Sequence, residues 1–290
     1  MATTNRHPLT ATDEMAIKAM RAAIAAHPIA MTREAFDQLT EHGLQAEGVI
    51  YTNAMVGDVS GVWCTPARPT SEAAILYLHG GAYVMGSAHA YRHFVGQIAS
   101  RTGVAAFIPD YRLAPEHPFP AAVEDVSATY RRLAGKFGSE RMAIVGDSAG
   151  GGLALACLQI AKGAACGVLM SPWIDLALTG ESMTSKAAED PILTKTALEG
   201  AARQYLGRHG LREPRASPIY GPMEDLSAIQ VHVGSAEILL DDSLRLGAAQ
   251  QVELHVWDGM PHVFPVLEFD AAREAMGLIS TFVRAHVGRG

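Results

Sequence analysis

Short apolar runs alternate with amphipathic stretches along most of the 290-residue chain. An apolar run bounded by turn residues predicts a buried strand, and apolar residues at helical spacing predict a helix. The first two expected strands have no helix between them, which indicates a hairpin at one edge of the sheet. The pattern as a whole is typical of an α/β fold, with one mostly parallel sheet of about eight strands and helices on both faces. Strands are expected at 48–54, 61–65, 73–78, 104–108, 142–145, 167–170, 229–233 and 252–256. Helices are expected at 91–101, 121–136, 148–162, 243–250 and 267–286.

Two parts of the chain differ from this alternation. Residues 12–26 and 32–42 have helical periodicity but precede every expected strand. Residues 176–218 are polar and contain helix-like segments, such as 194–206, but no clear strand. Such a stretch is too long for a simple connection. We therefore expect N-terminal cap helices in 1–45 and one large domain in 46–290, which carries a cap insertion at about 176–218.

The composition supports a large core and limits the partners. Hydrophobic residues make up 49% of the chain and charged residues 18%, which argues against disorder. The net charge is -7 and no run of lysine and arginine occurs, so we expect no general attraction to nucleic acid or to anionic membranes. No apolar run approaches the length of a membrane span.

The cysteines indicate a reducing compartment. They show no C-x-x-C spacing and no neighbouring histidine cluster, so buried free thiols are expected rather than a metal site. The first residues of the chain lack an apolar signal core. We therefore predict a cytoplasmic protein that needs no metal and no organic cofactor. The cysteines are Cys64, Cys157 and Cys166.

A serine lies between an expected strand and an expected helix, in the sequence Gly-Asp-Ser-Ala-Gly. Such a serine, here Ser148, is held at a sharp turn with its hydroxyl exposed, as a nucleophile requires. Gly146 and Gly150 flank it because side chains at these two positions would collide in so tight a turn. The motif alone also fits an ordinary glycine-rich turn, so the prediction of a nucleophile depends on the rest of the chain.

A serine nucleophile needs a histidine base, which follows it in the chain order of sheet hydrolases. Three histidines are candidates. His232 and His255 lie within strand runs, where a structural histidine is the simpler interpretation. His262 lies in a turn-rich loop between the last strand and the last helix, from which it could reach over the sheet edge. We therefore predict that His262 is the base.

The acid that orients the base is expected in the loop after the strand at 229–233. Glu237 is the first carboxylate past that strand and is the preferred candidate. Asp241 remains the alternative, although it and Asp242 fit the first turn of the next helix. Asp258 is a weaker candidate with a structural interpretation.

A glycine-rich loop follows the strand at 73–78 and reads His-Gly-Gly-Ala-Tyr from His79. Glycines allow backbone N–H groups to approach a developing oxyanion without obstruction by side chains. In α/β-hydrolases this loop acts together with the N–H of the residue after the nucleophile. The predicted oxyanion hole is therefore Gly80, Gly81 and Ala149.

As a set, three segments resemble the bacterial hormone-sensitive-lipase-like esterases: His79-Gly80-Gly81-Ala82, Tyr111-Arg112-Leu113-Ala114-Pro115-Glu116 and Gly146-Asp147-Ser148-Ala149-Gly150. The resemblance covers nearly the whole chain. It implies an α/β-hydrolase core, a cap built from the N-terminus and an insertion, and hydrolysis of carboxylic esters, commonly short-acyl ones.

Two positions depart from the family pattern. Ala82 replaces a third glycine of the oxyanion loop. The family's acid is usually aspartate in Asp-Pro-Leu-x-Asp, which aligns here with Glu237-Ile238-Leu239-Leu240-Asp241. The acid is therefore one methylene longer than in most of the family.

Further residues have two interpretations each. Tyr83 and Trp173 could line a substrate pocket or pack in the core. The segment 112–120 could brace the floor of the site through Asp110, Arg112 and Glu116 or form a rigid connection.

The predicted activity is hydrolysis of a small ester through an acyl-enzyme intermediate. An amidase, a lactonase or a carbamate hydrolase could use the same residues, and a non-catalytic small-molecule receptor on this fold is a more distant alternative. The last strand, 252–256, could pair edge to edge in a homodimer.

Overall fold

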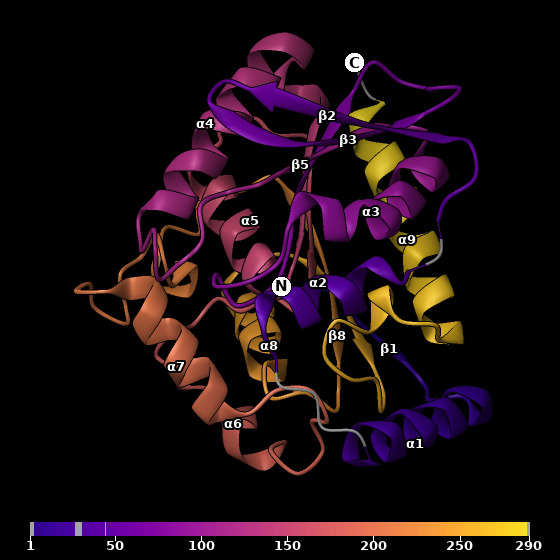
Figure 1. Ribbon diagram of the computed structural model, residues 1–290, viewed down its shortest axis with the longest axis vertical. Coiled ribbons are helices and arrows are strands. Elements are labelled where there is room, and N and C mark those ends of the chain that lie inside the picture. Colours follow the sequence, from indigo (N-terminus) through magenta and orange to yellow (C-terminus); the bar gives the residue numbers. More distant parts are fainter. Residues whose placement is uncertain (1–2, 27–30, 44, 289–290) are drawn as a thin grey trace.

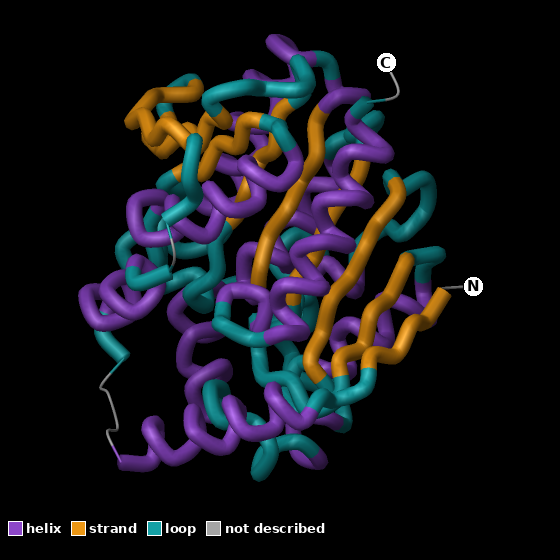
Figure 2. Tube along the Cα trace, turned by 90° about the vertical axis from the view of Figure 1, so that its right-hand side faces the viewer, coloured by secondary structure: helices purple, strands orange, loops and turns teal. Residues whose placement is uncertain are grey.

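The computed structural model describes residues 3–26, 31–43 and 45–288. These residues form a nine-stranded sheet in the order β1-β9-β8-β7-β6-β4-β5-β3-β2, which Figure 1 and Figure 2 show from two sides. The strands are β1 (Thr3–His7), β2 (Val49–Val56), β3 (Val59–Pro66), β4 (Ala74–Leu78), β5 (Ala105–Pro109), β6 (Met142–Asp147), β7 (Cys166–Met170), β8 (Ala228–Gly234) and β9 (Glu253–Trp257).

The helices form two layers over this sheet (Figure 1). On one face, α3 and α9 cover a core that includes Ile75 and Val145. On the other face, α4, α5 and α8 cover a core that includes Leu76 and Ile144. The helices are α1 (Ala11–Ala26), α2 (Arg33–Glu41), α3 (Ala88–Thr102), α4 (Ala121–Phe137), α5 (Ser148–Ile160), α6 (Ser182–Ser185), α7 (Lys195–Leu206), α8 (Leu240–Ala249) and α9 (Asp270–Val287).

The parallel strands are apolar on both faces because helices cover both. All five residues of β4 are fully buried, and alternate residues point into the two cores. The predicted α/β class, the eight predicted strands and the hairpin are confirmed. That hairpin joins β2 and β3 in antiparallel register, with Tyr51 opposite Cys64.

The ninth strand, β1, was not expected from the sequence. Its residues, Thr-Thr-Asn-Arg-His, are polar and mostly exposed, so no apolar pattern marks them. It pairs in parallel with β9, with Asn5 opposite His255, and His7 stacks on Trp257 at 3.7 Å between ring centroids. Because β1 covers β9, the strand at 252–256 is not an edge, and the prediction of a dimer through that strand is wrong.

Helices α1, α6 and α7 lie toward one end of the molecule, whereas α2 packs beside α3 (Figure 1). Helix α1 packs against α9 through Ile17, which belongs to a cluster with Phe264 and Ala275. The guanidinium of Arg21 on α1 donates to the backbone oxygen of Glu189, between α6 and α7. The two parts that departed from the strand–helix alternation are therefore in contact. None of the helices in the described ranges combines the length and apolarity that crossing a membrane requires.

Candidate active site

The serine of the glycine-rich motif lies at a strained turn. Strand β6 ends at Asp147 and helix α5 begins at Ser148, whose φ is +51°. A Cβ on Gly146 would lie 2.3 Å from the backbone oxygen of Gly150. A Cβ on Gly150 would lie 2.0 Å from the backbone oxygen of Leu78. The expected reason for both glycines is confirmed, and the strain is of the kind that functional sites store.

Three side chains far apart in the sequence form a hydrogen-bonded chain. His262 Nε2 lies 2.9 Å from Ser148 Oγ, and His262 Nδ1 lies 3.1 Å from Glu237 Oε1. Because a carboxylate only accepts, the proton is on Nδ1, and Nε2 is left to accept from the serine hydroxyl. Glu237 is fully buried, whereas Ser148 is 8% exposed and can be reached from outside.

The charge around His262 favours its protonated form. Burial alone would lower the pKa of the imidazole, but the carboxylate of Glu237 raises it, and Asp190 and Asp147 add to this effect. The net result is a pKa above the ordinary histidine value. Such a residue accepts a proton readily, as a general base must.

The other carboxylates considered from the sequence have different partners. Asp241 accepts from the backbone N–H of Ser182 at 2.8 Å, and Asp242 accepts from those of Ile174 and Asp175. Both lie in the first turn of α8, as expected. Asp258 forms an ion pair with Arg6 at 3.7 Å, at the surface. Of these carboxylates, the structure brings Glu237 to His262.

The two strand histidines also have their ring nitrogens engaged. His232 Nδ1 accepts from Trp257 Nε1 at 3.2 Å, and its Nε2 faces Gln230 Oε1 at 3.0 Å. His255 Nδ1 lies 2.8 Å from His7 Nε2, and its Nε2 lies 2.8 Å from a carboxylate oxygen of Glu253. These contacts agree with the structural interpretation of both residues.

The loop after β4 is fixed differently from the prediction. The N–H of Gly80 donates to Asp147 Oδ1 at 3.0 Å, so it is not a free donor, and its predicted place in the oxyanion hole is wrong. Within the ranges that the structure describes, no acceptor is found for the N–H of Gly81 or Ala82. The N–H of Ala149 lies in the first turn of α5, where helix geometry provides it no partner.

The aspartate before the serine holds this loop in place. Asp147 is 1% exposed and accepts from the hydroxyls of Tyr77 at 2.7 Å and Tyr91 at 3.0 Å, besides the N–H of Gly80. Burial raises the pKa of Asp147 to about 6, although these donors oppose the shift. No role was predicted for Asp147 from the sequence. Its place between a glycine and the serine of the motif was the only signal available.

The two aromatic residues considered for a substrate pocket are core residues. Tyr83 and Trp173 are at most 1% exposed, and their ring centroids are 5.7 Å apart. Tyr83 stacks on Tyr205 of α7 at 3.9 Å, and Trp173 Nε1 donates to the backbone oxygen of Asp175. These contacts agree with the core-packing interpretation of both residues. Through the stack of Tyr83 on Tyr205, they connect the insertion to the core of the large domain.

The segment at 112–120 is anchored at several points. Arg112 forms a bidentate ion pair with Asp125 of α4, and Glu116 pairs with Arg33 of α2 at 2.6 Å. Just before it, Asp110 accepts from the N–H of Ala88, the first residue of α3. These contacts agree with the bracing interpretation.

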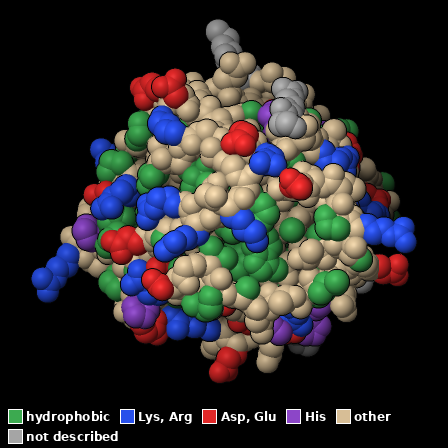
Figure 3. Space-filling model, turned by 90° about the horizontal axis from the view of Figure 1, so that it is seen from above, with side chains coloured by type: hydrophobic (Ala, Val, Ile, Leu, Met, Phe, Trp, Pro, Cys, Tyr) green, Lys and Arg blue, Asp and Glu red, His purple; other side chains and the backbone are tan. Residues whose placement is uncertain are grey.

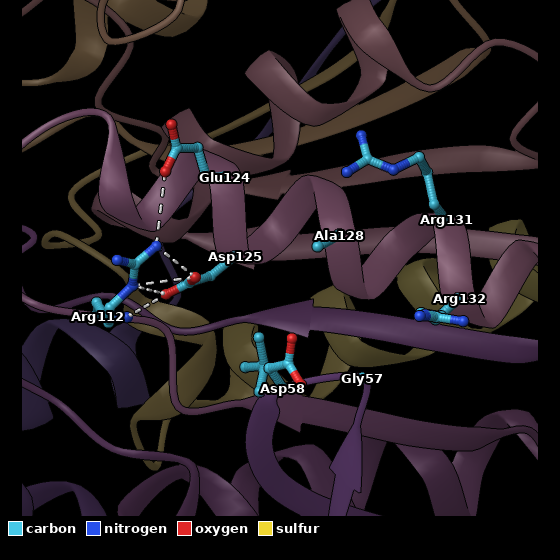
Figure 4. Close-up of a pocket in the computed structure, with 9 residues that line it drawn as sticks. Gly57, Asp58, Arg112, Glu124, Asp125, Ala128, Arg131 and Arg132 are labelled. Atoms are coloured by element: carbon cyan, nitrogen blue, oxygen red, sulfur yellow. Dashed lines mark hydrogen bonds and ion pairs between the residues drawn. The ribbon is translucent and has the colours of Figure 1, made fainter.

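A depression of about 770 Å³ lies elsewhere, between the β2–β3 turn and α4 (Figure 4). Charged side chains of both signs line it, and Arg112 is paired there with Asp125 and Glu124. The face in Figure 3 likewise carries basic and acidic side chains around apolar ones. Within the described residues, no group of three or more histidine, cysteine or acidic side chains is placed to hold a metal ion.

Comparisons with known proteins agree with this geometry. A family profile described as alpha/beta hydrolase fold matches residues 75–266. The chain is similar to an acetyl-hydrolase of Streptomyces hygroscopicus, with 38% identity over 81% of this chain and 83% of that protein. It is also similar to an esterase of Acinetobacter venetianus, with 35% identity over 74% of this chain and 76% of that protein.

A solved structure provides the same result at the level of the fold. An esterase from the bacterial hormone-sensitive lipase family superposes with a TM-score of 0.89 at 35% identity, covering 97% of this chain and all of that one. The family match and the similarity of sequence and structure to esterases together assign the chain to a family. The chain belongs to the α/β-hydrolase family, among the bacterial hormone-sensitive-lipase-like esterases, and it hydrolyses carboxylic esters.

Proposed function

We propose that this esterase acts by two-step acyl transfer, with Ser148 as the nucleophile, His262 as the base and Glu237 as the acid that orients it. The observation that carries the proposal is the continuous chain from Glu237 Oε1 through the imidazole to Ser148 Oγ, with separations of 3.1 Å and 2.9 Å. His262 takes the hydroxyl proton as Oγ bonds to the ester carbonyl carbon. It then returns that proton to the departing alcohol, leaving an acyl-serine.

The second step repeats the sequence with water. His262 removes a proton from water, the hydroxide oxygen bonds to the acyl carbon, and the proton returns to Ser148 as the carboxylic acid leaves. In both steps the N–H groups of Gly81, Ala82 and Ala149 hold the tetrahedral oxyanion. The proposal assigns the third donor to Ala82 because the N–H of Gly80 is bonded to Asp147.

A small acyl group is the preferred substrate in this proposal. Ser148 is 8% exposed and His262 5%, so only a small part of either side chain is open to a substrate. Two relatives are named acetyl-hydrolases, one of them from Streptomyces hygroscopicus. Both observations favour acetyl and other short-acyl esters.

The proposed cap consists of the helices in 1–45 and the insertion at about 176–218. It is supported by contacts that tie both parts to the site. Arg33 of α2 donates to the backbone oxygens of Val84 at 2.7 Å and Ala114 at 2.8 Å. Asp190 of the insertion accepts from the N–H of Ile238, next to Glu237. A cytoplasmic location is also proposed, supported by the three free, buried cysteines.

The test is Ser148→Ala, assayed against nitrophenyl esters from acetate to octanoate. We expect turnover to fall by roughly a thousandfold or more, with an unchanged far-UV spectrum. In the wild type, kcat/KM should fall as the acyl chain lengthens.

Ser280→Ala is the matched control, because Ser280 is a buried serine whose hydroxyl bonds within α9 to the backbone oxygen of Met276. That variant should keep its turnover. Normal activity in Ser148→Ala would refute the assigned nucleophile, and equal rates along the series would refute the short-acyl preference.

A further inference from the structure

Ser171, the residue that follows β7, has a backbone conformation that L residues rarely adopt. Its φ is +46° and its side chain is fully buried. Such a conformation is unfavourable for an L residue and persists where the surrounding structure requires it. The backbone N–H of Ser171 donates to the backbone oxygen of His232 on β8, which fixes the turn in place.

The hydroxyl of Ser171 contacts both loops that supply the acid and the base. Ser171 Oγ donates to Glu237 Oε2 at 2.7 Å and accepts from the N–H of Val263 at 2.9 Å. Val263 follows His262 directly and also has a positive φ, of +51°. Since a hydroxyl has one proton, the bond to the carboxylate uses it, and Val263 fills an acceptor position.

We propose that Ser171 is a positioning residue, whose hydroxyl fixes the carboxylate of Glu237 and the backbone beside His262 in one geometry. This inference rests on the proposed function, because it takes Glu237 and His262 to be the acid and the base.

The chemistry of a buried glutamate explains the need for such a residue. Glutamate has one more rotatable bond than aspartate, so its carboxylate requires more restraint to face the imidazole. Oε1 faces His262, whereas Oε2 is held by Ser171 and by the N–H of Gly234 at 3.0 Å. Without the hydroxyl, Oε2 keeps one donor, and the N–H of Val263 is buried without an acceptor.

The experiment compares Ser171→Ala, Ser171→Gly and Thr102→Ala with nitrophenyl acetate. Thr102, like Ser171, has a buried hydroxyl that both donates and accepts. It donates to the backbone oxygen of Ile98 and accepts from the N–H of Val104, at the end of α3. For Ser171→Ala we expect kcat to fall roughly tenfold or more, with KM unchanged within about twofold. Thr102→Ala should lower the melting temperature but leave kcat unchanged.

Ser171→Gly separates the hydroxyl from the backbone strain. Glycine adopts a positive φ without penalty, so this variant should melt above Ser171→Ala. Its kcat should be as low as that of the alanine variant, because both lack the hydroxyl. Recovery of kcat in the glycine variant would show that backbone strain is the cause and would overturn the proposal.

A double-mutant cycle tests whether Ser171 acts through Glu237. Adding Ser171→Ala to Glu237→Gln should lower kcat by much less than it does in the wild type, since the carboxylate to be positioned is gone. Equal effects in both backgrounds would overturn the positioning role. Full activity in Ser148→Ala or Glu237→Gln would instead overturn the proposed function, so the two failures are distinguishable.

Discussion

Two groups of histidines and carboxylates lie on strands β8 and β9 and the loops that follow them, and one of these groups fits an active site. In the first, the loop group, His262 lies between Glu237 and Ser148, with its Nε2 2.9 Å from the serine Oγ. In the second, the strand group, the rings of His232 and His255 stack with 4.7 Å between their centroids, and His255 Nε2 lies 2.8 Å from Glu253 Oε1. Both groups contain an imidazole beside a carboxylate, so that pair alone does not indicate catalysis.

The difference lies in what the second ring nitrogen meets. In the strand group it meets another fixed side chain, such as His7 at 2.8 Å from His255. In the loop group it meets a hydroxyl that is partly exposed and held at a strained turn. His262 can therefore exchange a proton with a reacting hydroxyl, whereas both ring nitrogens of His255 are engaged in hydrogen bonds to fixed side chains.

The same substitution in both groups gives the largest expected contrast. His262→Gln should lower kcat by roughly a thousandfold or more, because it removes the imidazole that takes the proton of Ser148. His232→Gln should change kcat by less than about threefold but lower the melting temperature, because it disturbs a fully buried position. Steady-state kinetics and thermal melts of both variants measure this contrast, which reversed effects would refute.

Neutralising the two carboxylates near the loop gives the next contrast. Glu237→Gln should lower kcat by about a hundredfold or more, because the imidazole loses the charge that orients it. Asp241→Asn keeps an oxygen that can accept from the N–H of Ser182, so kcat should change by less than about threefold. Purified variants assayed with nitrophenyl acetate test this. A severe loss in Asp241→Asn alone would transfer the role of the acid to Asp241.

The dependence of kcat/KM on pH distinguishes the loop group from the strand group. His262 must be neutral to act as a base, and its pKa is raised, so kcat/KM should fall on the acid side at a pH above the ordinary histidine value of 6.5. Glu237 is the largest cause that raises this pKa, so Glu237→Gln should move the fall to lower pH.

Glu253→Gln removes the same charge beside His255 and serves as the control for that measurement. The profile of this variant should match that of the wild type. An unchanged profile in Glu237→Gln, or a shift in the Glu253 variant, would contradict the separation of the two groups.

The smallest expected effect concerns stability in acid. Burial lowers the pKa of His232 well below its ordinary value, and His255 and His7 lower it further. The unfolded chain therefore binds a proton at His232 that the folded chain does not, and stability falls as the pH drops below about 6.5. Urea unfolding at about pH 5 and pH 7 should show a smaller difference for His232→Gln than for the wild type. An equal difference would indicate that His232 does not titrate on unfolding.

Much of the fold and site could be predicted because the signals were local. The strand before Ser148, the helix after it and the turn around His262 are all read from neighbouring residues. Gly80 was misassigned because a glycine shows that a backbone is accessible but not which acceptor its N–H meets. Ser171 was missed because its partners, Glu237 and Val263, are 66 and 92 residues away. Polar strand β1 gave no apolar signal to read.

Strand β1 also determines when the sheet can be completed. Thr3–His7 are synthesised long before β9, with which they pair and which begins at Glu253. His7 and His255 are 248 residues apart in the chain. Contacts of such long range form late, since the intervening chain must first be ordered. During synthesis, β1 therefore has no partner strand until the chain has been made as far as β9.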